Sequence, residues 1–109
     1  MPKTDALQGS LDLLVLKILS RKPRLHGYGI MSAIGEHSGE VLRAEEGSLY
    51  PALHRMEQSG WIAAEWGLTE TGRKAKYYRL MAAGRKELEQ AEKSFDQLVK
   101  GVRAVLRYA

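Results

Sequence analysis

Basic side chains gather in two short stretches of this chain, at residues 21–24 and 73–79. The two clusters contain Arg21, Lys22, Arg24, Arg73, Lys74, Lys76 and Arg79. The net charge is +3 over residues 1–30, −5 over residues 31–72 and +6 over residues 73–109, so basic ends flank an acidic middle. Clustered cations attract phosphate, so nucleic acid is one candidate partner. Two solvated surfaces explain the charge distribution equally well until the motifs are considered.

Side chains that could support catalysis or hold a metal ion are few. The candidates are three histidines and one pair of glutamates: His26, His37, His54, Glu45 and Glu46. No two histidines lie four residues apart, and no glycine-rich phosphate loop follows a predicted strand. The chain has no cysteine, which excludes a thiolate zinc site and a cysteine nucleophile. We expect no enzyme activity, no cofactor and no metal site.

The length of 109 residues and the hydrophobic content of 44% indicate one small globular unit. A chain of this size buries only roughly 65% of the surface that its unfolded form exposes, so we expect a partner to add stability. No apolar run exceeds four residues, as in Leu13–Leu16, which predicts no membrane span. With no secretory signal at the N-terminus, the expected location is the cytoplasm.

The predicted elements alternate between helices and one β-hairpin. Helices are expected over residues 10–20, capped by Ser10, over 27–37, and from Ser48 to Gly60 with Pro51 in the first turn. Residues 61–68 and 75–80 read as two strands joined by a polar, basic turn, and a long helix follows from residue 82. This order predicts a mainly α (α+β) fold, a winged helix-turn-helix with a two-stranded wing and a C-terminal helix.

Apolar residues of the last helix repeat at intervals of three and four, which is the heptad pattern of a helix that packs against another helix. The first helix is apolar nearly all round and offers a surface for this seam, in the same chain or in a second copy. The predicted dimerisation residues are Leu11, Leu14, Val15, Ile18, Leu88, Ala91, Phe95, Leu98, Val102 and Val105. We therefore expect a DNA-binding domain over residues 7–80 and a dimerisation helix over residues 81–109.

Four short motifs, in order and with consistent spacing, resemble the PadR family of bacterial transcriptional regulators. They are residues 25–29 (LHGYG), 47–53 (GSLYPAL), 60–62 (GWI) and 72–80 (GRKAKYYRL), and the similarity extends over about residues 7–106. Met81 departs from the family, which usually has a helix-capping threonine there. The resemblance implies a homodimer that binds a palindromic operator and usually represses transcription, with the third helix in the major groove and the wing beside it.

Eight residues are predicted to contact DNA under this resemblance. Tyr28, Ser48 and Tyr50 lie near helix N-termini, where hydroxyl and backbone N–H groups can bind phosphate, and His54 and Arg55 follow one turn later. The Arg55 guanidinium is the candidate for contacting a guanine edge. Phosphates or the minor groove are the expected targets of the wing cations Arg73, Lys74 and Lys76.

Each of these roles has an alternative. Tyr50 could be a core aromatic residue, and Arg55 could pair with Glu57 or another nearby acid instead of a base. Glu45 and Glu46 would repel phosphate and are expected to face away from it. Only one of Tyr77 and Tyr78 can point into the core, because neighbours in a strand face opposite ways.

Two other hypotheses stay open from the sequence. A winged helix can also serve as a protein-interaction module without binding DNA. Trp61, Trp66 and Phe95 could line a site for a small-molecule effector of unknown identity, although packing in the hairpin and in the dimer core is the simpler interpretation of them.

Overall fold

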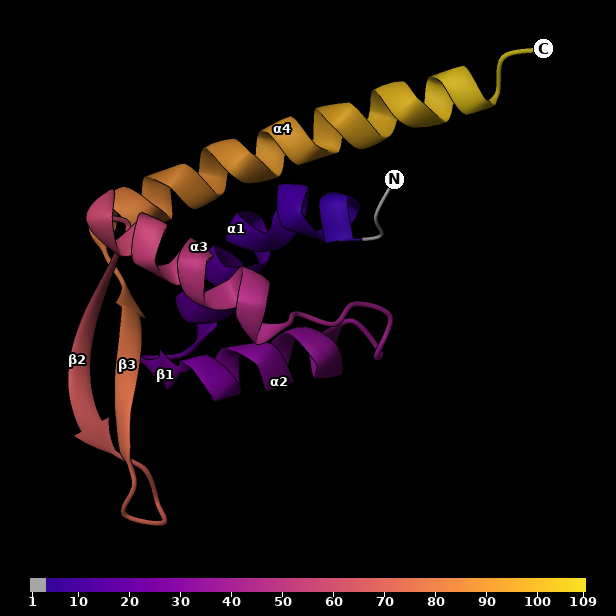
Figure 1. Ribbon diagram of the computed structural model, residues 1–109. Helices are drawn as coiled ribbons and strands as arrows, with labels where there is room; N and C mark the ends of the chain where they lie inside the picture. The colour runs from indigo at the N-terminus through magenta and orange to yellow at the C-terminus, as the bar shows by residue number, and fades with distance from the viewer. Residues whose placement is uncertain (1–3) are drawn as a thin grey trace.

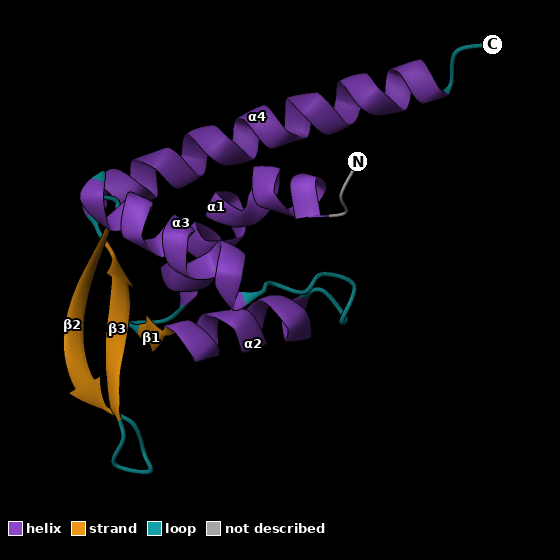
Figure 2. Ribbon diagram, in the orientation of Figure 1, coloured by secondary structure: helices purple, strands orange, loops and turns teal. Residues whose placement is uncertain are grey.

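The computed structural model describes the backbone of residues 4–109 and the side chains from Ser10 onward. The elements follow in the order α1 (Thr4–Arg21), β1 (Leu25–His26), α2 (Gly27–His37), α3 (Glu46–Gln58), β2 (Ile62–Leu68), β3 (Lys74–Leu80) and α4 (Ala82–Leu106). Helices α1, α2 and α3 form one group, a narrow sheet projects beside it, and α4 extends beyond it (Figure 1). Figure 2 shows that the fold is mainly helical, with its strands gathered in one small sheet, in agreement with the mainly α (α+β) class predicted.

Helix α1 is the centre of the core. It begins at Thr4, so Ser10 lies inside the helix and is not its N-cap, contrary to the prediction. Leu11, Val15, Leu16 and Leu19 are almost completely buried within the chain, because α2, α3, β3 and α4 all pack against α1. The apolar surface of α1 is therefore mostly buried by other elements of the same protomer.

Helices α2 and α3 form the helix-turn-helix unit. The connector between them turns at Gly39 and Glu40, both with positive φ. Glu45 is the N-cap residue of α3 and makes no side-chain capping hydrogen bond, so Ser48 lies within the first turn and is not the cap that the sequence suggested. A Cβ at Gly27 would lie 2.5 Å from the Tyr50 hydroxyl oxygen, so glycine is required for α2 and α3 to approach this closely.

The sheet has three antiparallel strands in the order β1-β3-β2, one more than predicted. The additional strand is the two-residue β1, which pairs Leu25 with Tyr78 and His26 with Tyr77. Strands β2 and β3 form the wing, and their turn closes at Gly72, whose φ is +82°. The third strand attaches the wing to the start of α2.

Helix α4 joins the core only through its first turns. Gly84 lies against the backbone carbonyl of Trp61, where a Cβ would not fit, and Leu88 is buried against the core. The helix then continues past the end of α1 into solvent (Figure 1). Within residues 4–109, no helix combines the length and apolar character that crossing a membrane requires.

The predicted dimerisation residues differ in how far they are buried within one protomer. Leu11, Val15 and Leu88 are buried inside the protomer as members of its hydrophobic core, which leaves almost none of their surface for a second copy. Leu14, Ile18 and Ala91 are half-buried. The side chains that remain exposed are further along α4: Phe95, Leu98, Val102 and Val105.

Candidate nucleic-acid interface

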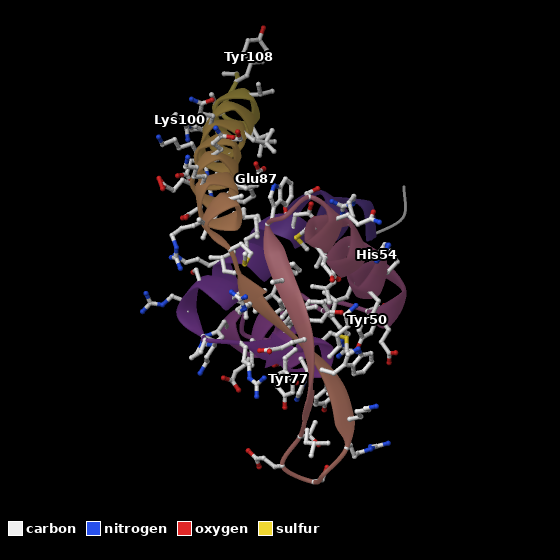
Figure 3. All side chains as sticks on the ribbon, turned by 90° about the vertical axis from the view of Figure 1, so that its left-hand side faces the viewer. Tyr50, His54, Tyr77, Glu87, Lys100 and Tyr108 are labelled. Carbon is white, nitrogen blue, oxygen red and sulfur yellow. The ribbon has the colours of Figure 1, made fainter. Side chains whose placement is uncertain are left out.

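Helix α3 has one face in the core and one in solvent. Leu49, Leu53 and Met56 are buried, and Tyr50 and His54 lie on the outside. Figure 3 shows Tyr50 and His54 on the same side of the molecule, one turn apart along the helix and beside the wing. The exposed face of α3 is therefore open to a large partner.

Tyr28 and Ser48 lie at the helix N-termini, as predicted. Tyr28 is 70% exposed in the first turn of α2. The Nδ1 atom of His26 accepts a hydrogen bond from the Gly29 backbone N–H at 3.0 Å, which caps this helix. Ser48 is half-buried, and its own N–H donates to the Glu45 carbonyl, so its hydroxyl is the group left for a ligand.

Tyr50 is partly packed and partly exposed. Its ring packs against Gly27 of α2, and 41% of its surface still faces solvent. The hydroxyl end of the Tyr50 side chain therefore supports the contact between α2 and α3, and another part of the side chain stays open to solvent.

The wing carries cations on the face that continues from the core. Tyr78 is buried, and alternation along β3 puts Lys76 and Lys74 on the same face of the sheet. An open groove of about 600 Å³ separates this face from the N-termini of α2 and α3. It is lined by aromatic and basic side chains that include Tyr28, Tyr50, Trp66, Arg73, Lys74 and Lys76.

The wing cations differ in their partners. The Lys76 Nζ atom lies 3.4 Å from a carboxylate oxygen of Glu57, which links the wing to α3. Arg73 and Lys74 take part in none of the ion pairs among the described residues. Arg73 and Lys74 thus present most of the uncompensated positive charge on this part of the wing.

Arg55 has a partner that the sequence did not predict. Its guanidinium donates two hydrogen bonds to the Asp12 carboxylate of α1, at 2.6 and 3.1 Å. The hydrogen bond to Asp12 raises the pKa of Arg55 above its ordinary value. The arrangement corresponds to the alternative in which Arg55 pairs with an acid, but that acid is Asp12, 43 residues away, and Glu57 pairs with Lys76 instead. A guanidinium held in this way would have to leave Asp12 before its two parallel donors could bind a guanine.

The two glutamates before α3 are both exposed. Glu45 caps the helix through its backbone carbonyl, which accepts from the N–H groups of Ser48 and Leu49, and Glu46 lies in the first turn. Their negative charges lie at the positive, N-terminal end of the α3 dipole, where they stabilise the helix.

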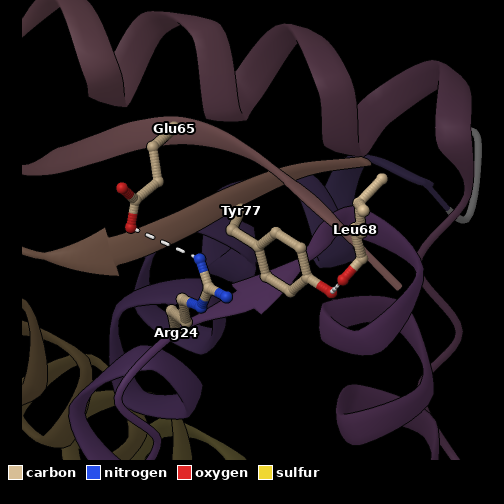
Figure 4. Close-up of polar contacts among 4 residues, drawn as sticks. All are labelled: Arg24, Glu65, Leu68 and Tyr77. Atoms are coloured by element: carbon tan, nitrogen blue, oxygen red, sulfur yellow. Dashed lines mark hydrogen bonds and ion pairs between the residues drawn. The ribbon is translucent and has the colours of Figure 1, made fainter. Parts of the chain in front are cut away.

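The opposite face of the sheet is occupied by a separate cluster that the sequence analysis missed. The Arg24 guanidinium stacks 4.2 Å from the Tyr77 ring centre and lies 3.4 Å from a Glu65 carboxylate oxygen. The Tyr77 hydroxyl donates to the Leu68 carbonyl at 3.2 Å (Figure 4). Arg24 thus supports the wing from its other face, and its place in the basic stretch at residues 21–24 was the sequence signal for it.

The two adjacent tyrosines of β3 divide as predicted. Tyr78 is 5% exposed and faces the core, whereas Tyr77 faces Arg24 and His26 on the other side of the sheet. Burial, with a smaller contribution from the negative charge of Glu57, raises the pKa of Tyr78.

The three aromatic residues considered for an effector site lie in different places. Trp61 packs against the core beside α4, and Trp66 lines the groove on the wing at 66% exposure. Phe95 lies on the exposed part of α4. The interpretation as a packing residue therefore fits Trp61, which contacts the core, and does not fit the exposed Trp66.

Comparison with known proteins identifies the family. The model of the transcriptional regulator PadR-like family matches residues 15–90. The chain belongs to the PadR-like family. Its family and its structural neighbours are transcriptional regulators and not enzymes.

Similar sequences come from several bacteria. The chain is 30% identical over 98 residues to Uncharacterized protein X of Lysinibacillus sphaericus, a match that covers 90% of this chain and 89% of that protein. It is 31% identical to Transcriptional regulator Rv3488 of Mycobacterium tuberculosis, over 72% of this chain and 69% of that protein. It is 33% identical to Negative transcriptional regulator PadR of Bacillus subtilis, over 64% of this chain and 38% of that protein.

Solved structures of similar proteins have the same fold. A transcriptional regulator from Clostridium thermocellum is similar with a TM-score of 0.83 and 28% identity, over 92% of this chain and 96% of that one. A PadR-like transcriptional regulator from Bacillus cereus is similar with a TM-score of 0.78 and 28% identity, over 96% and 99% of the two chains.

Proposed function

We propose that this PadR-family regulator binds double-stranded DNA as a homodimer, recognises a two-fold symmetric operator and represses transcription from it. The observation that carries the proposal is the groove at which the N-terminal end of α3 meets the cationic face of the wing. A major groove admits an α-helix, and cations beside that helix can bind the flanking phosphates. The name of the Bacillus subtilis relative, a negative transcriptional regulator, supports repression as the direction of control.

The side chains of α2 and α3 are proposed to make two kinds of DNA contact, one to base edges and one to phosphates. The exposed imidazole of His54 can donate to or accept from a base edge, and it is our candidate for sequence recognition. The hydroxyls of Tyr28, Ser48 and Tyr50 are suited to phosphate oxygens, which fix the position of the helix without reading sequence. The pairing of Arg55 with Asp12 favours a role in orienting α3 over direct base contact.

The wing supplies affinity. Arg73 and Lys74 carry uncompensated charge at its tip, and Lys76 is partly neutralised by Glu57. Each phosphate contact releases counterions, so the affinity that these residues contribute falls as the salt concentration rises.

The second copy is proposed to cover α4. In a single chain Leu98 is 62% exposed and Val105 is 72% exposed, and both belong to one apolar stripe of a helix whose other faces are charged. Burying this stripe against its symmetry mate is the simplest way to remove it from water. The proposal keeps residues 7–80 as the DNA-binding part and residues 81–109 as the dimerisation helix.

The test is a fluorescence-anisotropy titration of two labelled duplexes, one from upstream of the protein's own gene and one with the same bases shuffled. At low salt we expect both to bind, the upstream duplex more tightly, and both affinities to fall steeply when the salt concentration is raised. The double variant Arg73→Ala, Lys74→Ala should weaken binding to both duplexes by a similar factor and flatten the salt dependence.

A matched control is Lys100→Ala, which removes an exposed cation from the outer face of α4, away from the wing. It should leave both affinities and the salt dependence unchanged. If neither duplex binds at low salt, the proposal is overturned, and a module that binds a protein partner is favoured instead.

A further inference from the structure

The wing presents an exposed tryptophan. Trp66 lies on β2 with 66% of its surface in contact with solvent, and it is paired in register with Lys76 of β3. Alternation along β2 puts Trp66 on the same face as Ile62, which is buried in the core. The face that packs on the core at one end of the hairpin therefore presents an indole ring to water at the other end.

The neighbours of Trp66 give this surface its charge. The groove that it lines also contains Arg73, Lys74 and Lys76, and no carboxylate belongs to its lining among the side chains described from Ser10 onward. One of these cations, Lys76, pairs with Glu57 of α3. An aromatic ring beside uncompensated cations matches an anionic partner that also offers apolar surface.

A second wing cannot be that partner. Two such faces would bring Arg73 and Lys74 of one copy against the same cations of the other, and like charges at close range repel. A strand of DNA supplies both required properties, because negatively charged phosphates alternate with the apolar faces of deoxyribose rings.

We propose that Trp66 is a DNA-contacting residue of the wing, in which the indole ring packs on the sugars of one strand and its Nε1–H donates to a phosphate oxygen. The inference rests on the proposed DNA binding. It adds an aromatic contact to the phosphate contacts that the wing cations alone could make. Since every nucleotide has the same sugar and phosphate, Trp66 contributes affinity without sequence preference.

The experiment uses the variant Trp61→Phe, which leaves Trp66 as the only tryptophan of the chain. Adding the upstream duplex should change the emission of Trp66 and reduce its quenching by acrylamide, both at the concentrations at which anisotropy reports binding. In the wild-type background, Trp66→Ala should weaken binding to the upstream and shuffled duplexes alike, by roughly tenfold. Trp66→Phe, which keeps a ring and lacks the N–H donor, should lose less.

Tyr108→Ala is the matched control, because Tyr108 is an aromatic residue with 88% exposure at the far end of the molecule. It should not change the affinity. If the duplex binds while the emission and quenching of Trp66 stay unchanged, the inference is wrong and the proposed DNA binding stands. If the duplex does not bind at all, the proposed function itself fails. If acrylamide quenching falls when the protein is concentrated without DNA, Trp66 belongs to a contact between copies and the inference is overturned.

Discussion

Arg55 shows how one distant contact changes the role assigned to a residue. An arginine on the outer half of a recognition helix is a candidate for contacting guanine, but here Asp12 holds both of its terminal nitrogens. A bidentate pair fixes the orientation of the guanidinium as well as its position. Because it joins α1 to α3, this pair is suited to setting the angle at which α3 leaves the core.

The role of the pair can be tested by removing each partner. Arg55→Ala and Asp12→Asn should each lower stability by less than about 1 kcal/mol, because water screens a pair whose arginine is more than half exposed. Both variants should weaken binding to the upstream and shuffled duplexes by the same factor in anisotropy titrations. A loss confined to the upstream duplex in Arg55→Ala, with Asp12→Asn unaffected, would instead make Arg55 a base-contacting residue.

At the scale of elements, Tyr77 and Tyr78 hold the two faces of the hairpin in place through different contacts. Tyr78 anchors β3 to the core, and Tyr77 holds the other face through Arg24 and the Leu68 carbonyl. The wing is therefore held on both faces, and its tip can carry cations without contributing to the core.

The buried phenol of Tyr78 predicts a dependence of stability on pH. Its pKa is raised in the folded chain, mainly by burial, so above about pH 10 the unfolded chain releases this proton more readily than the folded one. The stabilisation of the folded chain by the protonated Tyr78 side chain is fully present below that pH. It is lost as the pH rises through the higher pKa of the folded state. Denaturant titrations between pH 9 and 11 should show a steeper fall for the wild type than for Tyr78→Phe.

Tyr108→Phe serves as the control for this measurement, because the Tyr108 side chain is in solvent. Its stability should fall with pH as steeply as that of the wild type. Equal slopes for the wild type and Tyr78→Phe would contradict the assignment.

Local patterns predicted most of the elements, and contacts between distant residues account for what they missed. Two short extended runs joined by a polar, glycine-containing turn predicted the hairpin, and the heptad spacing predicted α4. The strand β1 escaped prediction because two residues are too few to alternate, and it exists through pairing with β3, about 50 positions later. The start of α1 was placed too late because Ser10 resembles a cap, although a serine can also continue a helix.

In the candidate site, too, local sequence predicted some features, and contacts between distant residues determine the others. The positions of Tyr28, Tyr50, His54 and the wing cations follow from element order, which the motifs supply. The partner of Arg55 depends on packing between α1 and α3, and the exposure of Trp66 depends on how far the wing extends beyond the core. Neither has a signal within its own segment of sequence.

For the molecule as a whole, the main unexplained feature is that the apolar stripe on the second half of α4 is exposed to solvent in a single chain. The fold is 58 Å along its longest axis and 22 Å along its shortest, and α4 extends well beyond the helical core (Figure 1). A helix that projects with an apolar stripe is stable in water only if something covers the stripe.

The dimer predicts a specific result for Leu98→Glu. The change places two carboxylates in one apolar seam, so the variant should be monomeric by light scattering at concentrations where the wild type is a dimer. Lys100→Glu is the control, because this residue lies on the charged face of α4 and the variant should stay dimeric. A dimeric Leu98→Glu protein would refute the placement of the seam.

Sequence-specific binding by a symmetric pair of winged helices is the central claim, and hydroxyl-radical footprinting on the DNA upstream of the gene tests it most directly. The account predicts two protected half-sites related by two-fold symmetry, with centres about one helical turn or a whole number of turns apart. Protection should extend into the flanking backbone, where the two wings lie. A duplex without any protected site, or with a single unpaired one, would contradict the account.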